Sequence, residues 1–416
     1  MSITNATHDR PRTCPVGESV VGFADRDPFG FYERLREAGS PTWDPEARAW
    51  LVHDFDQCLI AERDESRFAN AYVFADEIVK EIKGGGANIT LSRDGDHVKL
   101  RRFHFKLLSA ANIESYRQIH IAPVLAASLA RLEGRTTADL AADYAAIIPA
   151  RVICSLLGMP TDDDAMVAEI LACNDAIVAF IASGYRDTDL RDKALAASRR
   201  LNEMLLPYIR ARRDEPADDF ISRVWRDAPD FGIHMDEEAA LGICRELFFA
   251  GSDTTVHGIA NALYLVLADP KLMDKVRANP EDALPAVVEE SLRLMNVVQF
   301  RHRFCMEDTE VGDTTVKKGE MIILLHAAAN RDPERFPCPA DVDLDRPDLT
   351  GHLAFARGTR SCVGSSLART EMHEAVREII DRFPHLHLDA SAEPPSFRGL
   401  YMRSMGPLNV ILGPSA

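Results

Sequence analysis

Apolar residues recur at spacings of three and four along most of this chain, which is the period of helices that bury one face. Ala, Leu, Glu and Arg, which favour the helical state, dominate these stretches. The pattern predicts helices over 27–39, 112–133, 136–158, 163–182, 186–213, 217–226, 236–269, 271–278, 282–295 and 364–383. Strand patterns are short and fall at 48–53, 315–324 and 408–412. The expected fold is therefore mainly α with small β-sheets.

No internal repeat, low-complexity tract or long Gly/Ser linker divides the chain, so we expect one domain over residues 1–416. The triplet Gly84 to Gly86 indicates a flexible loop. A second loop, 327–362, is rich in Pro, Asp and Arg and has no helical pattern. Because long ordered loops inside compact proteins are uncommon and often functional, this loop is a candidate for a site.

Composition and charge narrow the class of protein. Hydrophobic residues make up 46% and charged residues 27% of the chain, which argues against disorder and coiled coil. The 48 basic and 65 acidic residues give a net charge of −17, which would repel nucleic acid and anionic lipid. Met1 to Pro15 is polar, and no segment has about 18 consecutive apolar residues. We expect a soluble cytoplasmic protein with no membrane anchor and no nucleic-acid partner.

The eight cysteines include no C-x-x-C pair and no cluster of zinc-site spacing, which is typical of buried thiols in a reducing cytosol. Cys362 has a special context, because it ends a glycine-containing turn just before a predicted helix. Helix N-termini favour the thiolate, and Gly358 and Gly364 permit a positive φ and close approach of a ligand. The turn leaves several roles open for Cys362, namely nucleophile, disulfide partner, axial metal ligand or buried structural residue.

The predicted helix 236–269 is interrupted by Ala250-Gly251-Ser252-Asp253-Thr254-Thr255, a run of poor helix formers. Such a local inconsistency often marks a functional position. The Thr254 hydroxyl can bond back to the Ala250 carbonyl, and Leu247 shares their face. Asp253 and Thr254 offer an acid and a hydroxyl for proton delivery. A kink at a tight helix crossing is the alternative.

These segments, in this order, resemble the cytochrome P-450 family of haem-thiolate monooxygenases, specifically its soluble bacterial type, from about residue 94 to 412. The family's haem-binding loop is matched by Phe355, Gly358, Arg360, Cys362 and Gly364. Ala356 stands where the family usually has Gly, and we expect only a small adjustment there if φ is negative. The resemblance implies a P-450 fold that holds haem b between the long central helix and the helix after Cys362, with Cys362 as the iron ligand.

The resemblance also assigns roles to residues that would be unremarkable alone. Thr254 would hold dioxygen and Asp253 would relay protons, with Ala250 and Gly251 against the haem. Structural residues would be Glu290, Arg293 and Arg346, which would fasten the long loop. A solvated Glu/Arg pair, or the competing Glu289–Arg293 pair, is the alternative. The haem propionates would be bound by His97, Arg101, Arg303 and Arg360, with Arg301 as a competitor of Arg303.

Partners follow from the same resemblance. A chain of this length has no room for a fused flavin reductase, so we expect a separate ferredoxin and its NAD(P)H-dependent reductase, besides O2 and an apolar small molecule. A local basic face could dock the ferredoxin or could simply be solvated, and it would consist of Arg93, Lys99, Arg102, Lys106, Arg357 and Arg369.

The family's substrate pocket would be lined here by largely apolar residues, which suggests hydroxylation of a terpenoid, aromatic or steroid-like compound. These candidates are Val178, Phe180, Leu247, Val297, Val298 and Phe300, and ordinary core packing is the alternative for each. Three other functions remain open. They are a non-catalytic haem sensor or carrier, a peroxide-driven hydroxylase, which should lack the Asp253–Thr254 pair, and a cysteine hydrolase that uses Cys362 with His352 or His326.

Overall fold

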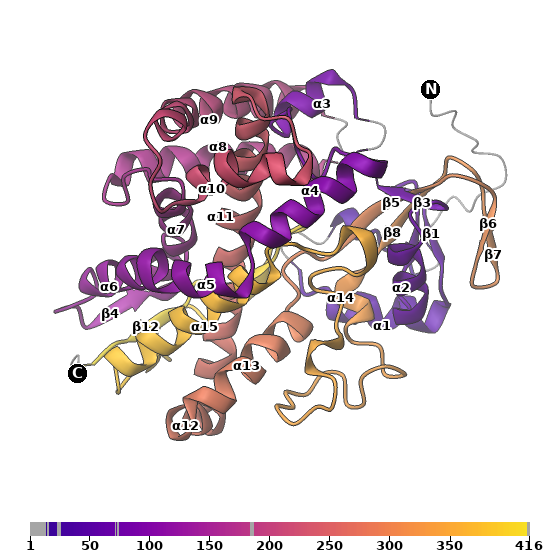
Figure 1. Ribbon diagram of the computed structural model, residues 1–416. Helices are drawn as coiled ribbons and strands as arrows, with labels where there is room; N and C mark the ends of the chain where they lie inside the picture. The colour runs from indigo at the N-terminus through magenta and orange to yellow at the C-terminus, as the bar shows by residue number, and fades with distance from the viewer. Residues whose placement is uncertain are drawn as a thin grey trace.

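The structure is a computed structural model that describes residues 14, 16–22, 26–70, 72, 75–183 and 187–413 (Figure 1). The prediction of a polar, leader-free Met1 to Pro15 therefore lies, apart from Cys14, outside the described residues. The helices are α1 Phe29–Ala38, α2 Phe55–Arg63, α3 Glu77–Ile82, α4 Asp94–Leu107, α5 Ala110–Tyr116, α6 Ala122–Ala130, α7 Ile148–Leu156, α8 Asp164–Ala182, α9 Thr188–Asp214, α10 Phe220–Asp227, α11 Glu237–Ala268, α12 Pro270–Ala278, α13 Pro280–Leu294, α14 His326–Ala329 and α15 Ser365–Arg382.

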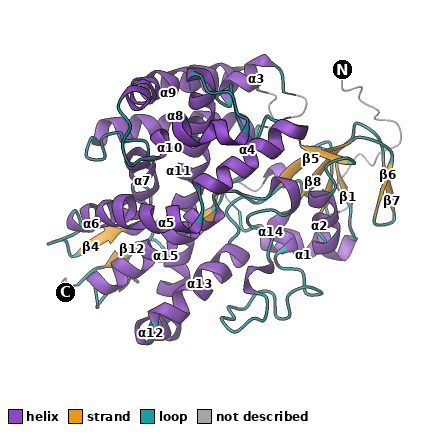
Figure 2. Cartoon of the chain, in the orientation of Figure 1, coloured by secondary structure: helices purple, strands orange, loops and turns teal. Residues whose placement is uncertain are grey.

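The strands are short, and those in the described residues form four small sheets. Their bounds are β1 Thr42–Asp44, β2 Ala49–Val52, β3 Phe68–Asn70, β4 Thr137–Asp139, β5 Arg301–Cys305, β6 Thr309–Val311, β7 Thr314–Val316, β8 Met321–Leu324, β9 His387–Leu388, β10 Ser396–Arg398, β11 Ser404–Gly406 and β12 Asn409–Ile411. The largest sheet has the order β1-β2-β8-β5-β3, and its only parallel pair joins β2 to β8. Figure 2 shows that helices make up most of the molecule, with this sheet on one side of them. The prediction of a mainly α fold with small sheets is confirmed.

Two predicted elements are divided in the structure. The prediction of one helix over 136–158 was wrong at its start, because Thr137–Asp139 forms β4 against β12 before a π-helical turn and α7. A strand partner more than 250 residues away leaves no trace in the local pattern. The predicted strand 315–324 is two strands, because the chain turns between β7 and β8 with Gly319 at φ +85°. A positive φ at glycine is compatible with a turn and ends a strand.

The central helix α11 has the length that the sequence indicates, 32 residues, or about 48 Å. The side chain of Asp236 caps its first turn by accepting a hydrogen bond from the backbone N–H of Ala239. Asp269 and Pro270 end it, since proline cannot continue the hydrogen-bond ladder. α7, α9, α13 and α15 all pack against it. The helix therefore lies at the centre of the helical part of the molecule.

The glycine triplet is a close-packed turn rather than the flexible loop that its composition predicts. All three glycines have positive φ, namely 98° at Gly84, 58° at Gly85 and 52° at Gly86. A Cβ on Gly86 would lie 2.2 Å from the carbonyl oxygen of Glu238, and one on Gly242 would lie 2.8 Å from Gly85 O. The triplet lets the chain after α3 lie directly on α11, and the same contact requires a glycine in the helix.

Among the described residues, α8 is the one helix that is long and apolar enough to cross a membrane by composition alone. It packs along α9, and core helices pass the same test.

The contact between α11 and the glycine turn is testable by replacing Gly242 with alanine. Gly242→Ala adds a methyl group 2.8 Å from Ala87 N and Gly85 O, so we expect a loss of about 1–3 kcal/mol in the free energy of unfolding. The matched control is Gly95→Ala in α4, where no atom lies within 4 Å of the new methyl group. The control should be neutral or stabilising by up to about 1 kcal/mol in chemical denaturation. Equal effects of both substitutions would contradict the close packing.

Candidate active site

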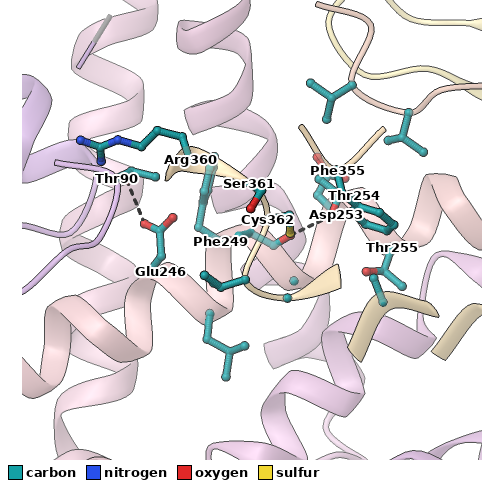
Figure 3. A pocket seen from close by; sticks show the side chains of 18 of the residues that line it. Thr90, Glu246, Phe249, Asp253, Thr254, Thr255, Phe355, Arg360, Ser361 and Cys362 are labelled. Atoms are coloured by element: carbon teal, nitrogen blue, oxygen red, sulfur yellow. Dashed lines mark hydrogen bonds between the residues drawn. The ribbon is translucent and has the colours of Figure 1, made fainter. Parts of the chain in front are cut away.

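A cavity lies between α11 and the loop that carries Cys362 (Figure 3), and we call it the central cavity. Its walls come from α4, the chain after α3, α11, the segment 296–303, the cysteine loop and the start of α15. Cys362 lines it on one side, and Ala250, Gly251, Asp253 and Thr254 line it from α11. The fold thus brings together the two segments that the sequence singles out, although 108 positions separate Thr254 from Cys362 in the sequence.

Backbone hydrogen bonds hold the cysteine loop in shape. The Cys362 N–H donates to the Phe355 carbonyl at 2.8 Å, and Ser361 N–H donates to Gly358 O at 3.2 Å. Gly358 has φ +76°, and a Cβ there would lie 2.7 Å from the Glu62 carbonyl. Gly364 differs from the prediction, because its φ is −86°. It still leaves open space beside the sulfur, since a Cβ there would have only Cys362 Sγ within 4 Å, at 3.9 Å.

The structure corrects the expectation for Ala356. Its φ is +54°, not negative, and the residue is buried. The left-handed region brings Cβ close to the following carbonyl oxygen and costs an alanine about 1–2 kcal/mol. The loop therefore keeps the conformation that suits glycine and carries backbone strain at this position.

The prediction that the helix N-terminus favours the Cys362 thiolate is also corrected. Burial raises the pKa of the Cys362 thiol, although the Gly364 N–H, Arg301 and Arg369 act to lower it. Desolvation of the charged form outweighs the helix terminus in the protein alone. A coordinated metal ion is then what would deprotonate the thiol outright.

The predicted features of the α11 stretch are present, with one change of role. The Thr254 hydroxyl donates to the Ala250 carbonyl at 2.8 Å, as expected, and Ser252 donates to Phe248 O at 2.8 Å. Leu247 lines the same cavity. Gly251 also borders the cavity, but a Cβ there would lie 2.9 Å from Ile153 Cδ1. Gly251 thus permits the close crossing of α11 and α7, which is the alternative that the sequence left open.

Asp253 has a neighbour that the sequence analysis missed. His257 Nε2 lies 3.7 Å from Asp253 Oδ1, and His257 Nδ1 is 2.8 Å from Ser404 Oγ. Burial raises the pKa of Asp253, so this carboxyl group keeps its proton to a higher pH than an exposed aspartate. Burial lowers the pKa of His257. The spacing of four residues on one helix was the available signal.

Cationic side chains gather where α4 and the cysteine loop border the cavity. Arg101 donates to Ser361 O at 2.8 Å and to Ser361 Oγ at 2.5 Å. Arg360 donates to Glu65 at 2.7 Å and to two backbone carbonyls. Burial, and then the charge of Arg360, lower the pKa of His97 to about 4, so His97 is neutral. All three predicted side chains line the cavity.

Arg301 and Arg303 both line the cavity from β5, because residues two apart in a strand share a face. Arg303 is engaged by Glu62 Oε2 at 2.9 Å. Burial would raise the pKa of Glu62, but Arg303 and His326 lower it to about 2. Arg301 Nε has no hydrogen-bond partner in the described part of the chain. Of these two candidates for binding a haem propionate, Arg303 already has a carboxylate partner, whereas Arg301 has none among the described residues.

These observations fit a flat, anionic, iron-bearing group. A buried guanidinium nitrogen without a partner requires an acceptor, which a propionate supplies. The space beside Gly364 next to the Cys362 sulfur leaves room for a planar ligand. No cluster of three or more His, Cys, Asp and Glu side chains suited to a metal ion occurs among the described residues. The thiol that lines this cavity is that of Cys362, and together with the guanidinium groups of Arg101, Arg301 and Arg360 it fits a haem-thiolate site.

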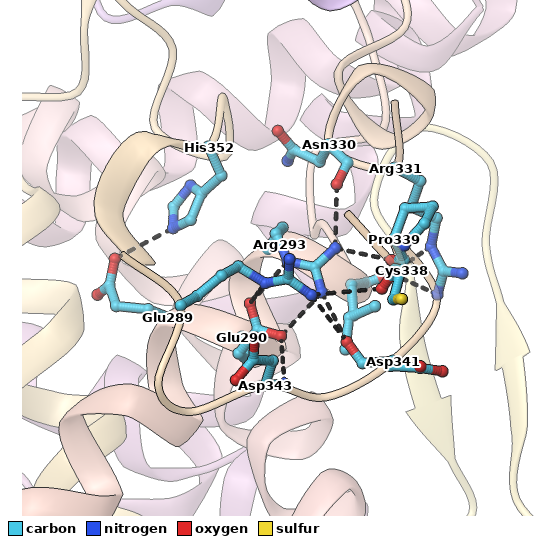
Figure 4. Close-up of polar contacts among 12 residues, drawn as sticks. Glu289, Glu290, Arg293, Asn330, Arg331, Cys338, Pro339, Asp341, Asp343 and His352 are labelled. Carbon is cyan, nitrogen blue, oxygen red and sulfur yellow. Dashed lines mark hydrogen bonds and ion pairs between the residues drawn. The ribbon is translucent and has the colours of Figure 1, made fainter. Parts of the chain in front are cut away.

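The long loop 327–362 is fastened by a buried ion pair (Figure 4). The guanidinium of Arg293 donates to both carboxylate oxygens of Glu290, at 2.7 and 2.8 Å, and both side chains are fully buried. Arg293 also donates to the carbonyls of Asn330, Pro339 and Asp341. Arg346 Nε lies 3.3 Å from Glu290 Oε1, and its other nitrogens donate to loop carbonyls. The structure brings the three predicted residues together.

The competing Glu289–Arg293 pair does not form. Glu289 instead accepts from Arg369 at 2.5 and 2.8 Å and lies 3.1 Å from His352 Nε2. Arg369 in turn lies over the ring of Phe355, 4.5 Å from its centroid. Arg369 is therefore directed inward, and the predicted basic face loses this member.

Four of the six predicted pocket residues line the central cavity, namely Val178, Leu247, Val297 and Val298. Phe180 and Phe300 do not, so these two predictions are corrected. Phe180 is two positions from Val178 on α8, which turns it about 200° away into the core. Phe300 packs edge-on against Tyr401, with 5.4 Å between ring centroids.

The cavity is also lined by polar and aromatic residues beyond the named candidates, among them Tyr72, Lys83, Glu246 and Phe249. On α11, Glu246 lies four positions before Ala250 and Phe249 lies four positions before Asp253, so helical spacing could have indicated both. The hydrolase hypothesis loses support, because neither His352 nor His326 lines the cavity that Cys362 borders.

Comparisons of this sequence and structure with known proteins all identify the same family. A model of the family Cytochrome P450 matches residues 85–412. The cytochrome P450 monooxygenase PikC of Streptomyces venezuelae is 32% identical over 92% of this chain and 89% of its own length. The 6-deoxyerythronolide B hydroxylase of Saccharopolyspora erythraea is 28% identical over 93% and 96% of the two chains. The crystal structure of CYP109E1 from Bacillus megaterium in complex with testosterone has a TM-score of 0.79 at 25% identity, with 93% and 99% coverage.

A cysteine loop and an acid–alcohol stretch that face one cavity inside a mainly α fold define a haem-thiolate enzyme. The chain belongs to the cytochrome P450 family. It is a P450 monooxygenase, and its cofactor is haem b.

The importance of the Glu290–Arg293 pair is testable with Arg293→Ala. This substitution leaves the fully buried Glu290 carboxylate without its main partner, so we expect a loss of about 3–5 kcal/mol in the free energy of unfolding, with weakened haem retention. Arg335→Ala is the control, because Arg335 pairs with Asp348 in the same loop but both are exposed. The control should lose no more than about 1 kcal/mol in chemical denaturation. An Arg293→Ala protein as stable as the control would refute the fastening role.

Proposed function

We propose that this P450 inserts one oxygen atom from O2 into an apolar small molecule, with electrons delivered from NAD(P)H by a separate ferredoxin and its reductase. The observation that carries the proposal is that Cys362 and the Asp253–Thr254 pair line one cavity. Haem held by a thiolate supplies the oxygen-activating chemistry. The protein supplies binding, orientation and protons.

Cys362 is the proposed iron ligand, while Phe355, Gly358, Arg360 and Gly364 shape the loop around it. His97, Arg101 and Arg360 would bind the propionates together with Arg301 or Arg303. Glu290, Arg293 and Arg346 would hold the loop in register. In each case the support is the contact already described, since all of the propionate candidates line the central cavity.

Proton delivery is proposed to run through Asp253 and Thr254. Burial raises the pKa of Asp253, which favours the protonated carboxyl group that an acid in the relay requires. The Thr254 hydroxyl is held by the Ala250 carbonyl at 2.8 Å, so its oxygen lone pairs point away from the helix backbone and accept hydrogen bonds in the cavity. This division of roles supports an O2-dependent rather than a peroxide-driven enzyme.

The walls near α8 and the segment 296–298 favour an apolar substrate, because Val178, Val297 and Val298 line them. The related hydroxylase is named for 6-deoxyerythronolide B, and the CYP109E1 structure contains testosterone. We propose that the substrate of this enzyme is likewise a terpenoid, aromatic or steroid-like compound.

The proposed ferredoxin face is the exposed side of α4 and its N-cap. Arg93, Lys99, Arg102 and Lys106 are exposed there, as is Phe105. Arg357, the remaining predicted member, is half-buried and donates to the Thr350 carbonyl. Such a mixture suits an acidic partner with an apolar centre. We further propose one P450 domain over residues 1–416, because β2 pairs with β8 across the chain, and a cytoplasmic location like that expected for a ferredoxin-dependent enzyme.

The function is tested by turnover with a ferredoxin, its reductase and NADPH under 18O2, using a panel of steroids, terpenoids and alkylaromatics. We expect a product that carries one heavy oxygen atom. NADPH consumption that stays at the substrate-free rate with every compound would instead support a haem sensor or carrier.

The proton relay is tested with Thr254→Ala. Removal of the hydroxyl should leave NADPH consumption largely intact, while product per NADPH falls several-fold and peroxide rises, because protons then reach the site without the positioned hydroxyl. Ser252→Ala is the matched control, since Ser252 makes the same back-bond to Phe248 O but does not line the cavity. Tight coupling in Thr254→Ala would remove Thr254 from the relay.

A further inference from the structure

One end of the central cavity holds a buried lysine. Lys83 lies at the end of α3, is 6% exposed and lines the cavity. Its Nζ lies 4.1 Å from the centre of the Phe249 ring and 4.9 Å from that of Tyr72, and both rings also line the cavity. The glycine turn that follows Lys83 fixes this position against α11.

The ammonium group of Lys83 lacks an acceptor. Within the described part of the chain it forms no hydrogen bond and no ion pair with a carboxylate, so its contacts are the two ring faces. Ring faces attract a cation but offer no lone pair to its three N–H donors. An ammonium group that faces a cavity without a protein acceptor is suited to bind an anionic group of a ligand.

The nearby carboxylate of Glu246 is already supplied with donors. Its Oε2 accepts from Asn88 Nδ2 at 2.7 Å and from Thr90 Oγ1 at 3.2 Å (Figure 3 shows the Thr90 contact). Asn88 also donates to the carbonyl of Lys83 at 2.8 Å, which ties the two charged residues to one scaffold. The unmet requirement at this end of the cavity is therefore an acceptor with negative charge, not a donor.

We propose that Lys83 binds a carboxylate of the substrate, so that the substrate is an amphiphilic acid with an apolar body. This inference rests on the proposed function, because it takes the central cavity as the substrate site. Phe249 precedes Thr254 by five residues, or about 7 Å along α11, so the bound carboxylate lies away from the proton relay. The apolar body then extends past Leu247 toward Val297, and oxidation falls on the body.

Glu246 sets a limit on the charge of the ligand. It lies three residues before Phe249, on the same face of α11, and repels anions. The site therefore suits one carboxylate and disfavours a dianion such as a phosphate monoester. Neutralising Glu246 should strengthen carboxylate binding.

The test uses matched acids and esters with the holoenzyme. Decanoic, dodecanoic and 4-phenylbutanoic acids are compared with their methyl esters at pH 7.5, and dissociation constants come from calorimetry and from the haem spin-state shift. At least one acid should bind tenfold or more tightly than its ester. Lys83→Met, which keeps the apolar stem, should reduce that preference to within about twofold while ester affinity stays the same.

Two further variants sharpen the result. Lys80→Met, in the same helix, removes an exposed lysine that pairs with Glu77 and should change nothing. Glu246→Gln should raise acid affinity several-fold. No acid–ester preference in the wild type, or a preference that survives in Lys83→Met, would overturn the proposal, and a thermal melt of Lys83→Met establishes that the variant is folded.

Failure of this inference is distinguishable from failure of the proposed function. An enzyme that oxidises neutral substrates with NADPH and O2 but binds acids and esters alike would refute only the role of Lys83. Acid preference measured by calorimetry in a protein without turnover would retain the Lys83 site and refute the monooxygenase proposal.

Discussion

The buried ion pair between Glu290 and Arg293 is the interaction on which the site depends. The loop 327–362 has little secondary structure, so its own hydrogen bonds cannot set its position. Arg293 sets it instead, because its fork binds Glu290 and three loop carbonyls at once. Loss of one of these partners would leave a fully desolvated charge uncompensated, which is energetically costly. The loop is therefore held in the position that these contacts fix. Cys362 reaches the cavity at the end of the segment that this pair anchors.

Three groups in the central cavity lack a stabilising partner within the described part of the protein until a ligand binds. Burial raises the pKa of Cys362, Arg301 Nε lacks an acceptor, and Lys83 rests on two aromatic rings. Iron and the haem propionates relieve the first two, and a substrate carboxylate would relieve the third. Ala356 carries backbone strain in the same loop. The site is thus arranged for its ligands at some expense to the protein alone, as functional sites often are.

Much of this arrangement is predictable from local sequence. The N-cap at Asp236 and Pro270 fix α11, and the spacing of Glu290 and Arg293 identifies their pair. Features that are set by residues far away in the sequence cannot be predicted from local patterns. β4 forms because β12 lies beside it, Gly251 is required by Ile153 of another helix, and Arg369 turns inward to Glu289. The sign of φ at Ala356 and the dominance of burial at Cys362 also follow from packing that no short pattern encodes.

The central claim is that Cys362 is the axial ligand of a haem in this cavity. The most direct measurement is the absorption spectrum of the purified protein after reduction and exposure to carbon monoxide. The account predicts a Soret band strongly shifted to the red, as thiolate ligation gives, and loss of that shift in Cys362→Ser. A band typical of imidazole-ligated haem, or an unchanged shift in Cys362→Ser, would contradict it.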